Sequence, residues 1–214
     1  VFAELMARCN LPDFQYSPLG LRDGVLAQML AERDRATLSR RQIEADRWDA
    51  ILAMCKRYQV EMPAAEHVRE LASQLFQQLI RVHNLPDEYA LWLAAAALLH
   101  DVGSFINRNG RHRHTYYLIA NSELLGFTPE QRQVIAALAR YLGRSRPEPA
   151  DAPMKALDAT DAKQVPKAVA LLRLAKALCP GREKNIRRVR AHVQGGKVHL
   201  ALQAKGSADL EMWT

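Results

Sequence analysis

Residues 87–103 read DEYALWLAAAALLHDVG, and this stretch sets the expected fold of the chain. Every residue from Leu91 to Leu99 is apolar, so a helix built from them has no face suited to water. Gly103 is a common stop signal just beyond a helix end. The sequence therefore predicts a buried central helix from Asp87 to about Asp101, around which the other helices of a mainly α-helical domain pack.

Amphipathic helices are expected on both sides of this central segment. Pro63 opens a helix whose apolar residues recur at intervals of three or four, at Val68, Leu71, Ala72, Leu75, Leu79 and Val82. A helical pattern also covers residues 25–58, and another covers residues 165–178. Thr128 followed by Pro129 and Gln131 is typical of a capped helix start. The helical domain is expected to span residues 25–145.

The period of the apolar residues changes near the C-terminus, which predicts strands. Apolar residues alternate from Val189 to Val193 and again from Val198 to Leu202, with Gly195 and Gly196 between them. Two glycines between alternating segments are typical of a β-hairpin. Leu210 and Met212 add a candidate third strand. The prediction is a small α+β domain over residues 150–214, with an antiparallel hairpin or a three-stranded sheet.

Composition limits the class of protein. The 214 residues are 49% apolar and 25% charged, which suits a globular core and excludes disordered and collagen-like chains. Cys9, Cys55 and Cys179 are isolated, which argues against a disulfide framework and for a reducing compartment. No apolar run approaches the ~20 residues that span a bilayer. We expect a cytoplasmic protein without a membrane partner, and the Val1 start suggests a piece of a longer chain.

The charge balance indicates an acidic partner. Thirty Lys and Arg residues against 23 Asp and Glu give a net charge of +7, and arginine forms strong charge-assisted hydrogen bonds with phosphate. The candidate phosphate-binding residues are Arg108, Arg111, Arg113, His114, Arg140, Arg144, Arg182, Lys184, Arg187 and Arg188. A solvated basic face is the alternative. Few aromatic residues accompany these clusters, so nucleic acid is not expected as a partner.

The doublet His100-Asp101 at the end of the central helix is the sharpest chemical feature. Together with His67 it offers nitrogen and oxygen ligands to a divalent metal, which is the arrangement of the HD phosphohydrolases. The alternative is that His100 is a hydrogen-bonded core histidine and Asp101 accepts a hydrogen bond at the helix end. The residues alone leave both interpretations open.

Residues 97–122, ALLHDVGSFINRNGRHRHTYYLIANS, resemble the helical C-terminal domain of the Ppx/GppA family of exopolyphosphatases and guanosine pentaphosphate phosphohydrolases. The segment 17–24, SPLGLRDG, is similar to the GLREG segment that closes the second actin-like lobe of that family. Residues 171–175 and the basic hairpin ending at Trp213 resemble its small last domain. The resemblance covers essentially the whole chain.

The resemblance implies a division of labour within a longer protein. Residues 1–24 would be the tail of an actin-like, RNase H-like lobe, and an HD-like domain and a small α+β domain would follow. The phosphoanhydride bond would be hydrolysed between two N-terminal lobes, with Mg²⁺ implied for the parent enzyme. No catalytic residue and no cofactor are expected in these residues, which contain no Gly-rich phosphate loop. The implied partners are polyphosphate or guanosine pentaphosphate, the lobes, and a second copy in a homodimer.

Two positions depart from an active HD site. Metal-dependent HD enzymes carry an Asp in a helix of the LADxL type, whereas residues 174–178 read LAKAL, with Lys176 at that position. Leu142 stands where the family usually has His. We therefore expect His67, His100 and Asp101 to be relics that hydrogen-bond in the core. A phosphate-binding and dimerisation module is the main hypothesis, and an autonomous HD phosphohydrolase acting on a nucleotide and a purely structural module are the alternatives.

Overall fold

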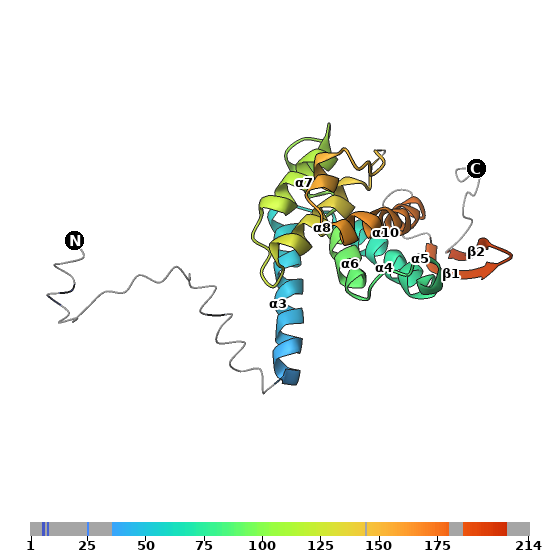
Figure 1. The fold of residues 1–214 in the computed structure, drawn as a ribbon, viewed down its shortest axis with the longest axis horizontal. Helices are drawn as coiled ribbons and strands as arrows, with labels where there is room; N and C mark the ends of the chain where they lie inside the picture. Colours follow the sequence, from blue (N-terminus) through green and yellow to red (C-terminus); the bar gives the residue numbers. More distant parts are fainter. Residues whose placement is uncertain are drawn as a thin grey trace. The chain divides into compact units, whose positions relative to one another are not determined.

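The computed structural model describes residues 6, 8, 25, 36–143, 145–179 and 186–204, with the backbone alone for 36–41. The chain divides into two compact units, Val1–Ala45 and Asp46–Thr214. Helix α3 comprises Ala36–Arg57 (Figure 1). Most of the predicted tail over residues 1–24 and the predicted third strand near Leu210 lie outside the described residues.

The second unit contains a series of helices followed by two strands. Along the chain the helical elements are α4 (Met62–Gln78), α5 (Ile80–His83), α6 (Glu88–Leu99), the 3₁₀ helix η2 (Val102–Phe105), α7 (Arg111–Asn121), α8 (Pro129–Arg140), α9 (Ala152–Lys155) and α10 (Ala159–Ala177). The strands are β1 (Ile186–Gln194) and β2 (Lys197–Ala204). The predicted fold class, a mainly helical chain that ends in a small antiparallel hairpin, is confirmed.

Helix α6 is the central helix that the sequence predicts. It contacts α4, α8 and α10, and every residue from Trp92 to Leu99 is buried. The buried Tyr89 donates a hydrogen bond from its hydroxyl to Oδ1 of Asp161 at 2.6 Å, which ties α6 to α10 and satisfies the polar end of an aromatic core residue. Although α6 is apolar all round, no described helix is both long and apolar enough to cross a membrane.

Helices α8 and α10 begin at residues whose side chains cap them. At α8, the N–H of Gln131 donates to the Thr128 hydroxyl, and the Gln131 side chain accepts from the Thr128 N–H, so the predicted capping box is confirmed. Helix α10 begins six residues before the predicted residue 165, because Oδ1 of Asp158 accepts the N–H of Asp161 at 2.7 Å and caps an earlier turn.

The hairpin forms as the alternating pattern predicts. Strands β1 and β2 pair antiparallel, with His192 opposite His199. Gly195 and Gly196 have φ values of +59° and +74°, which glycine adopts without steric cost in a two-residue turn. Strand β1 packs against α4, and α10 contacts α4, α6 and α8. The predicted domain boundaries stay a prediction.

Candidate functional site

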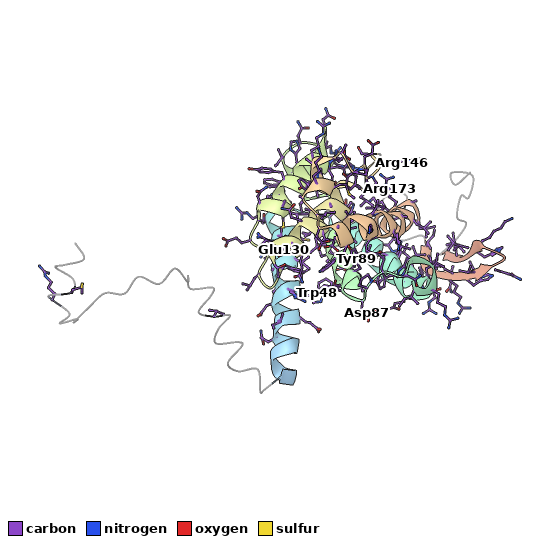
Figure 2. All side chains as sticks on the ribbon, in the orientation of Figure 1. Trp48, Asp87, Tyr89, Glu130, Arg146 and Arg173 are labelled. Atoms are coloured by element: carbon purple, nitrogen blue, oxygen red, sulfur yellow. The ribbon has the colours of Figure 1, made fainter. Side chains whose placement is uncertain are left out.

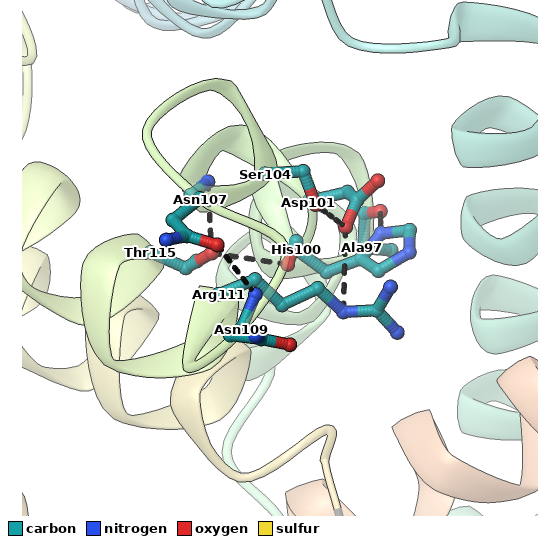
Figure 3. A network of polar contacts seen from close by, with 9 residues as sticks. Ala97, His100, Asp101, Ser104, Asn107, Asn109, Arg111 and Thr115 are labelled. Atoms are coloured by element: carbon teal, nitrogen blue, oxygen red, sulfur yellow. Dashed lines mark hydrogen bonds and ion pairs between the residues drawn. The ribbon is translucent and has the colours of Figure 1, made fainter.

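The end of α6 places His100 in the core. His100 is 5% exposed, and its Nδ1 lies 2.7 Å from the carbonyl oxygen of Ala97 (Figure 3). A carbonyl oxygen only accepts hydrogen bonds, so Nδ1 carries the proton and Nε2 keeps its lone pair. Burial, and then the charge of Lys176, lower the pKa of His100 to about 4. His100 is therefore neutral at physiological pH.

A buried threonine fixes the start of the following helices. The N–H of Gly103 donates to the hydroxyl of Thr115 at 3.0 Å, and that hydroxyl donates to the carbonyl oxygen of His100 at 3.2 Å (Figure 3). Thr115 is fully buried. These two bonds hold α7 against the turn after α6, so the first residues of α7 have a fixed position beside His100.

Asp101 sits at the edge of the site. Its Oδ1 accepts a hydrogen bond from the Ser104 hydroxyl at 2.6 Å and lies 3.6 Å from Nε of Arg111 (Figure 3). The side chains of Arg111 and Asp101 are 43% and 39% exposed. An ion pair this exposed, made through Nε without a second parallel hydrogen bond, contributes little to stability. The ion pair between Arg111 and Asp101 is therefore weak.

His112 lies in the first turn of α7 and is half-buried. Its ring packs so closely on the end of α8 that a Cβ added to Gly143 would lie 2.4 Å from Cδ2 of His112. Among the described residues, no partner hydrogen-bonds to its buried Nδ1. Burial lowers the pKa of His112, and the charges of Arg111 and Arg140 lower it further. Charged groups from other helices thus converge on this ring.

Four cations from three helices act electrostatically on the two histidines, and we call them the basic cluster: Arg111 of α7, Arg140 of α8, and Arg173 and Lys176 of α10. The charges of the three arginines each lower the pKa of His112. The charges of Lys176 and Arg111 each lower the pKa of His100. Asp101 is the carboxylate that acts on both rings in the opposite direction. The local field is therefore positive.

Arg173 connects α10 to the end of α8. Its Nε donates to the carbonyl oxygen of Tyr141 at 2.7 Å, and its Nη2 donates to the carbonyl oxygens of Gly143, at 2.5 Å, and Ser145. A guanidinium at the carbonyl end of a helix also complements the helix dipole. Burial and the nearby charge of Arg146 lower the pKa of Arg173 (Figure 2). Arg173 thus positions the end of α8, and Arg146 extends the positive field.

The donor groups at this site do not suit a metal ion. Among the described residues, no three His, Cys, Asp or Glu side chains are grouped to hold one. His67 is buried on α4, and the charges of Lys176 and Arg111 that act on His100 would repel a cation. The charge of Lys176, in the LAKAL segment, thus acts on His100 of the doublet. The Mg²⁺ ion that the resemblance implies belongs to the parent enzyme and stays a prediction about the longer protein.

The other candidate phosphate-binding residues fall into three groups. Arg108 and Arg113 are exposed and His114 is half-buried, all in the segment that contains Arg111. Two more are exposed on β1, beside α4 and away from α7 (Figure 1): Arg187 and Arg188. Three lie outside the described residues: Arg144, Arg182 and Lys184. The structure thus brings Arg111 and Arg140 together and places the hairpin arginines elsewhere.

Sequence reasoning missed Arg173 and His112 as members of the site, and it considered Lys176 only as an obstacle to a metal. Arg173 and Lys176 are three residues apart in the segment LLRLAKAL, so they lie on one face of a helix. Two cations on one face of a leucine-rich helix were the sequence signal that could have indicated this part of the site. The position of His112 depends on its contact with Gly143, 31 residues further on, which no local pattern shows.

The described residues form a mainly helical domain and a small basic hairpin. Within the helical domain, the basic cluster acts on the imidazoles of His100 and His112. Residues 47–210 match the family model described as Ppx/GppA phosphatase, domain III. This match covers more than half of the chain, and the chain therefore belongs to the Ppx/GppA phosphatase family. The resemblance seen in residues 97–122 is confirmed.

Curated relatives agree with this assignment. The chain is 34% identical over 128 residues to the guanosine-5'-triphosphate,3'-diphosphate pyrophosphatase of Aeromonas hydrophila, covering 59% of this chain and 25% of the relative. It is 29% identical over 190 residues to the protein of the same name in Vibrio vulnificus, covering 86% of this chain and 35% of the relative. The matches thus span about a quarter to a third of the length of these relatives.

Proposed function

We propose that this chain is the part of a phosphoanhydride hydrolase of the Ppx/GppA family that binds the phosphate chain of the substrate. In this proposal, hydrolysis takes place in N-terminal lobes of the longer protein. The basic cluster is the observation that carries the proposal. Contacts with those lobes and a homodimer, both implied by the resemblance, belong to the same proposal.

The basic cluster carries more positive charge than its one opposing carboxylate neutralises. Three helices contribute the four cations of the basic cluster, and Asp101 is the carboxylate acting against them. Arginine binds phosphate oxygens through its planar fork, and such charge-assisted hydrogen bonds are among the strong ones. A phosphate chain would also release counterions on binding. The buried Nδ1 of His112 adds a polar atom that a phosphate oxygen or hydroxyl could satisfy.

The substrate class follows from the same chemistry. The relatives are named for a guanosine carrying a 5'-triphosphate and a 3'-diphosphate, and inorganic polyphosphate presents a similar row of phosphates. Both would use the same cations of the basic cluster. We propose the phosphate chain as the shared ligand, and separate titrations with the two compounds distinguish the sources.

Replacing Arg111 and Arg140 together with glutamine is expected to weaken binding of both ligands about 100-fold, because each lost charge-assisted bond costs about 1.5 kcal/mol, which is about a factor of ten. The slope of log affinity against log salt should become shallower by about two, one for each lost charge. Isothermal titration of the 214-residue chain at several salt concentrations measures both quantities.

The matched control is Lys163→Gln with Lys167→Gln. These exposed lysines lie in the first half of α10, so the variant loses the same net charge away from the basic cluster. Near-normal affinity in this control supports a local site. An equal loss in both double variants, or no measurable binding by the unmodified chain, would contradict the proposal.

A further inference from the structure

The β-hairpin presents two different faces. Because side chains alternate along a strand, Val189 and Ala191 lie on one face, whereas Arg188, Arg190 and His192 lie on the other. Val189 is fully buried. In register with the second group, β2 supplies Gln203, Ala201 and His199. We call the face formed by these six residues the outer face of the hairpin.

Two glutamines of α4 hold the hairpin by the edge of β1. The N–H of Val189 donates to Oε1 of Gln74 at 2.9 Å, and Nε2 of Gln78 donates to the carbonyl oxygen of Val189 at 2.8 Å. The N–H of Ala191 donates to Oε1 of Gln78 at 2.7 Å. These side-chain amides replace the backbone of a neighbouring strand, so the hairpin is anchored without using its outer face.

The outer face combines positive charge with planar groups. No Asp or Glu occurs between residues 186 and 204. The imidazoles of His192 and His199 stack with ring centroids 5.0 Å apart and an interplanar angle of 15°. Next to this pair is a shallow depression lined by Arg188, Arg190, Ala201, Leu202 and Gln203. The outer face therefore presents two guanidinium groups, a pair of stacked imidazoles and the side-chain amide of Gln203 along the two strands.

We propose that the outer face of the hairpin binds single-stranded nucleic acid. Arg188 and Arg190 would contact the backbone phosphates, and the stacked imidazoles of His192 and His199 would support a base, since histidine rings and guanidinium planes both stack on bases. A bare phosphate chain would use the arginines but gain nothing from the paired rings. Charge complementarity supports this ligand, because residues 186–204 of the hairpin include no carboxylate.

This proposal departs from the expectation that nucleic acid is not a partner. That expectation rested on the few tyrosines near the arginine clusters. The imidazole pair arises from the hairpin register, which places His192 directly opposite His199. Two histidines seven residues apart give no stacking signal in the sequence, whereas in the structure their imidazole rings stack on each other.

The test is fluorescence anisotropy of the 214-residue chain with a labelled oligouridylate of about ten nucleotides. An abasic strand of equal length carries the same phosphates without bases. We expect salt-dependent binding of the oligouridylate, and at least about 5-fold weaker binding of the abasic strand. His192→Ala with His199→Ala should weaken oligouridylate binding by a similar factor and leave abasic binding unchanged.

Two controls isolate the outer face. Val193→Thr with Val198→Thr alters the neighbouring exposed pair on the opposite face and should leave binding unchanged. The Lys163→Gln, Lys167→Gln variant should also bind oligouridylate normally, because these exposed lysines lie on α10 and not on the hairpin. Equal affinity for abasic and base-carrying strands, or unimpaired oligouridylate binding by a folded double-histidine variant, would overturn the proposal and leave only attraction of polyanions.

Discussion

Alanine in place of Gly103 is expected to lower the free energy of unfolding by about 3 kcal/mol or more, at the upper end of overpacking costs. A Cβ at this position would lie 2.1 Å from the carbonyl oxygen of Arg111 and 2.4 Å from the backbone nitrogen of Thr115. Both contacts are with the backbone of α7, so no side-chain rotation relieves them. Urea unfolding of the two proteins measures the difference.

Gly195→Ala is the matched control for this prediction. Gly195 has a φ of +59°, and no heavy atom lies within 4 Å of the position that its Cβ would take. Its substitution therefore costs only the strain of a left-handed alanine, about 1 to 2 kcal/mol. If Gly103→Ala were no more destabilising than Gly195→Ala, the close packing of α7 on the turn after α6 would be wrong.

Acidification should destabilise the protein through His100. The pKa of this histidine is lowered from 6.5 to about 4 in the folded chain, so the unfolded state binds a proton that the folded state excludes. The resulting stability is fully present above pH 6.5 and is lost as the pH falls toward 4. The shift corresponds to a loss of up to about 3 kcal/mol.

Comparison with His100→Gln isolates this contribution, because other groups titrate in the same range. Burial also lowers the pKa of His112, which acts in the same direction, and burial raises the pKa of Asp161, which acts in the opposite one. Glutamine keeps a hydrogen-bond donor for Ala97 but does not titrate. The unfolding free energy of the variant should fall less steeply between pH 6.5 and 4. Parallel pH profiles would show that His100 titrates alike in both states.

Local signals in the sequence are sufficient for most of the fold. The apolar run of residues 91–99 predicts a buried helix because no face of it suits water. The Thr128 cap and the two glycines of the hairpin turn predict their elements because each satisfies a requirement of the local backbone. Asp158 is a cap of the same kind, and the start of α10 was missed because the prediction followed the apolar pattern from Val165 and not this cap.

The site depends on contacts that no local pattern encodes. Lys176 acts on His100 across 76 positions of the chain, and Arg173 binds the carbonyl oxygen of Tyr141 from 32 positions away. The pairing of Gln74 and Gln78 with β1 joins residues more than 110 positions apart. The residues themselves indicated the doublet, and the comparison with HD enzymes singled out Lys176, but only the structure shows that cations from α7, α8 and α10 act on the two histidines.

Phosphate binding at the basic cluster is tested most directly by the ring titration of His112. Nuclear magnetic resonance of the 214-residue chain follows this imidazole with and without saturating inorganic polyphosphate. In the free protein, burial and the charges of Arg111 and Arg140 hold the pKa of His112 below its ordinary value. A phosphate chain among these cations should raise that pKa, because its negative charge favours the imidazolium. An unchanged His112 titration at saturation would place the phosphate chain elsewhere and contradict the proposed site.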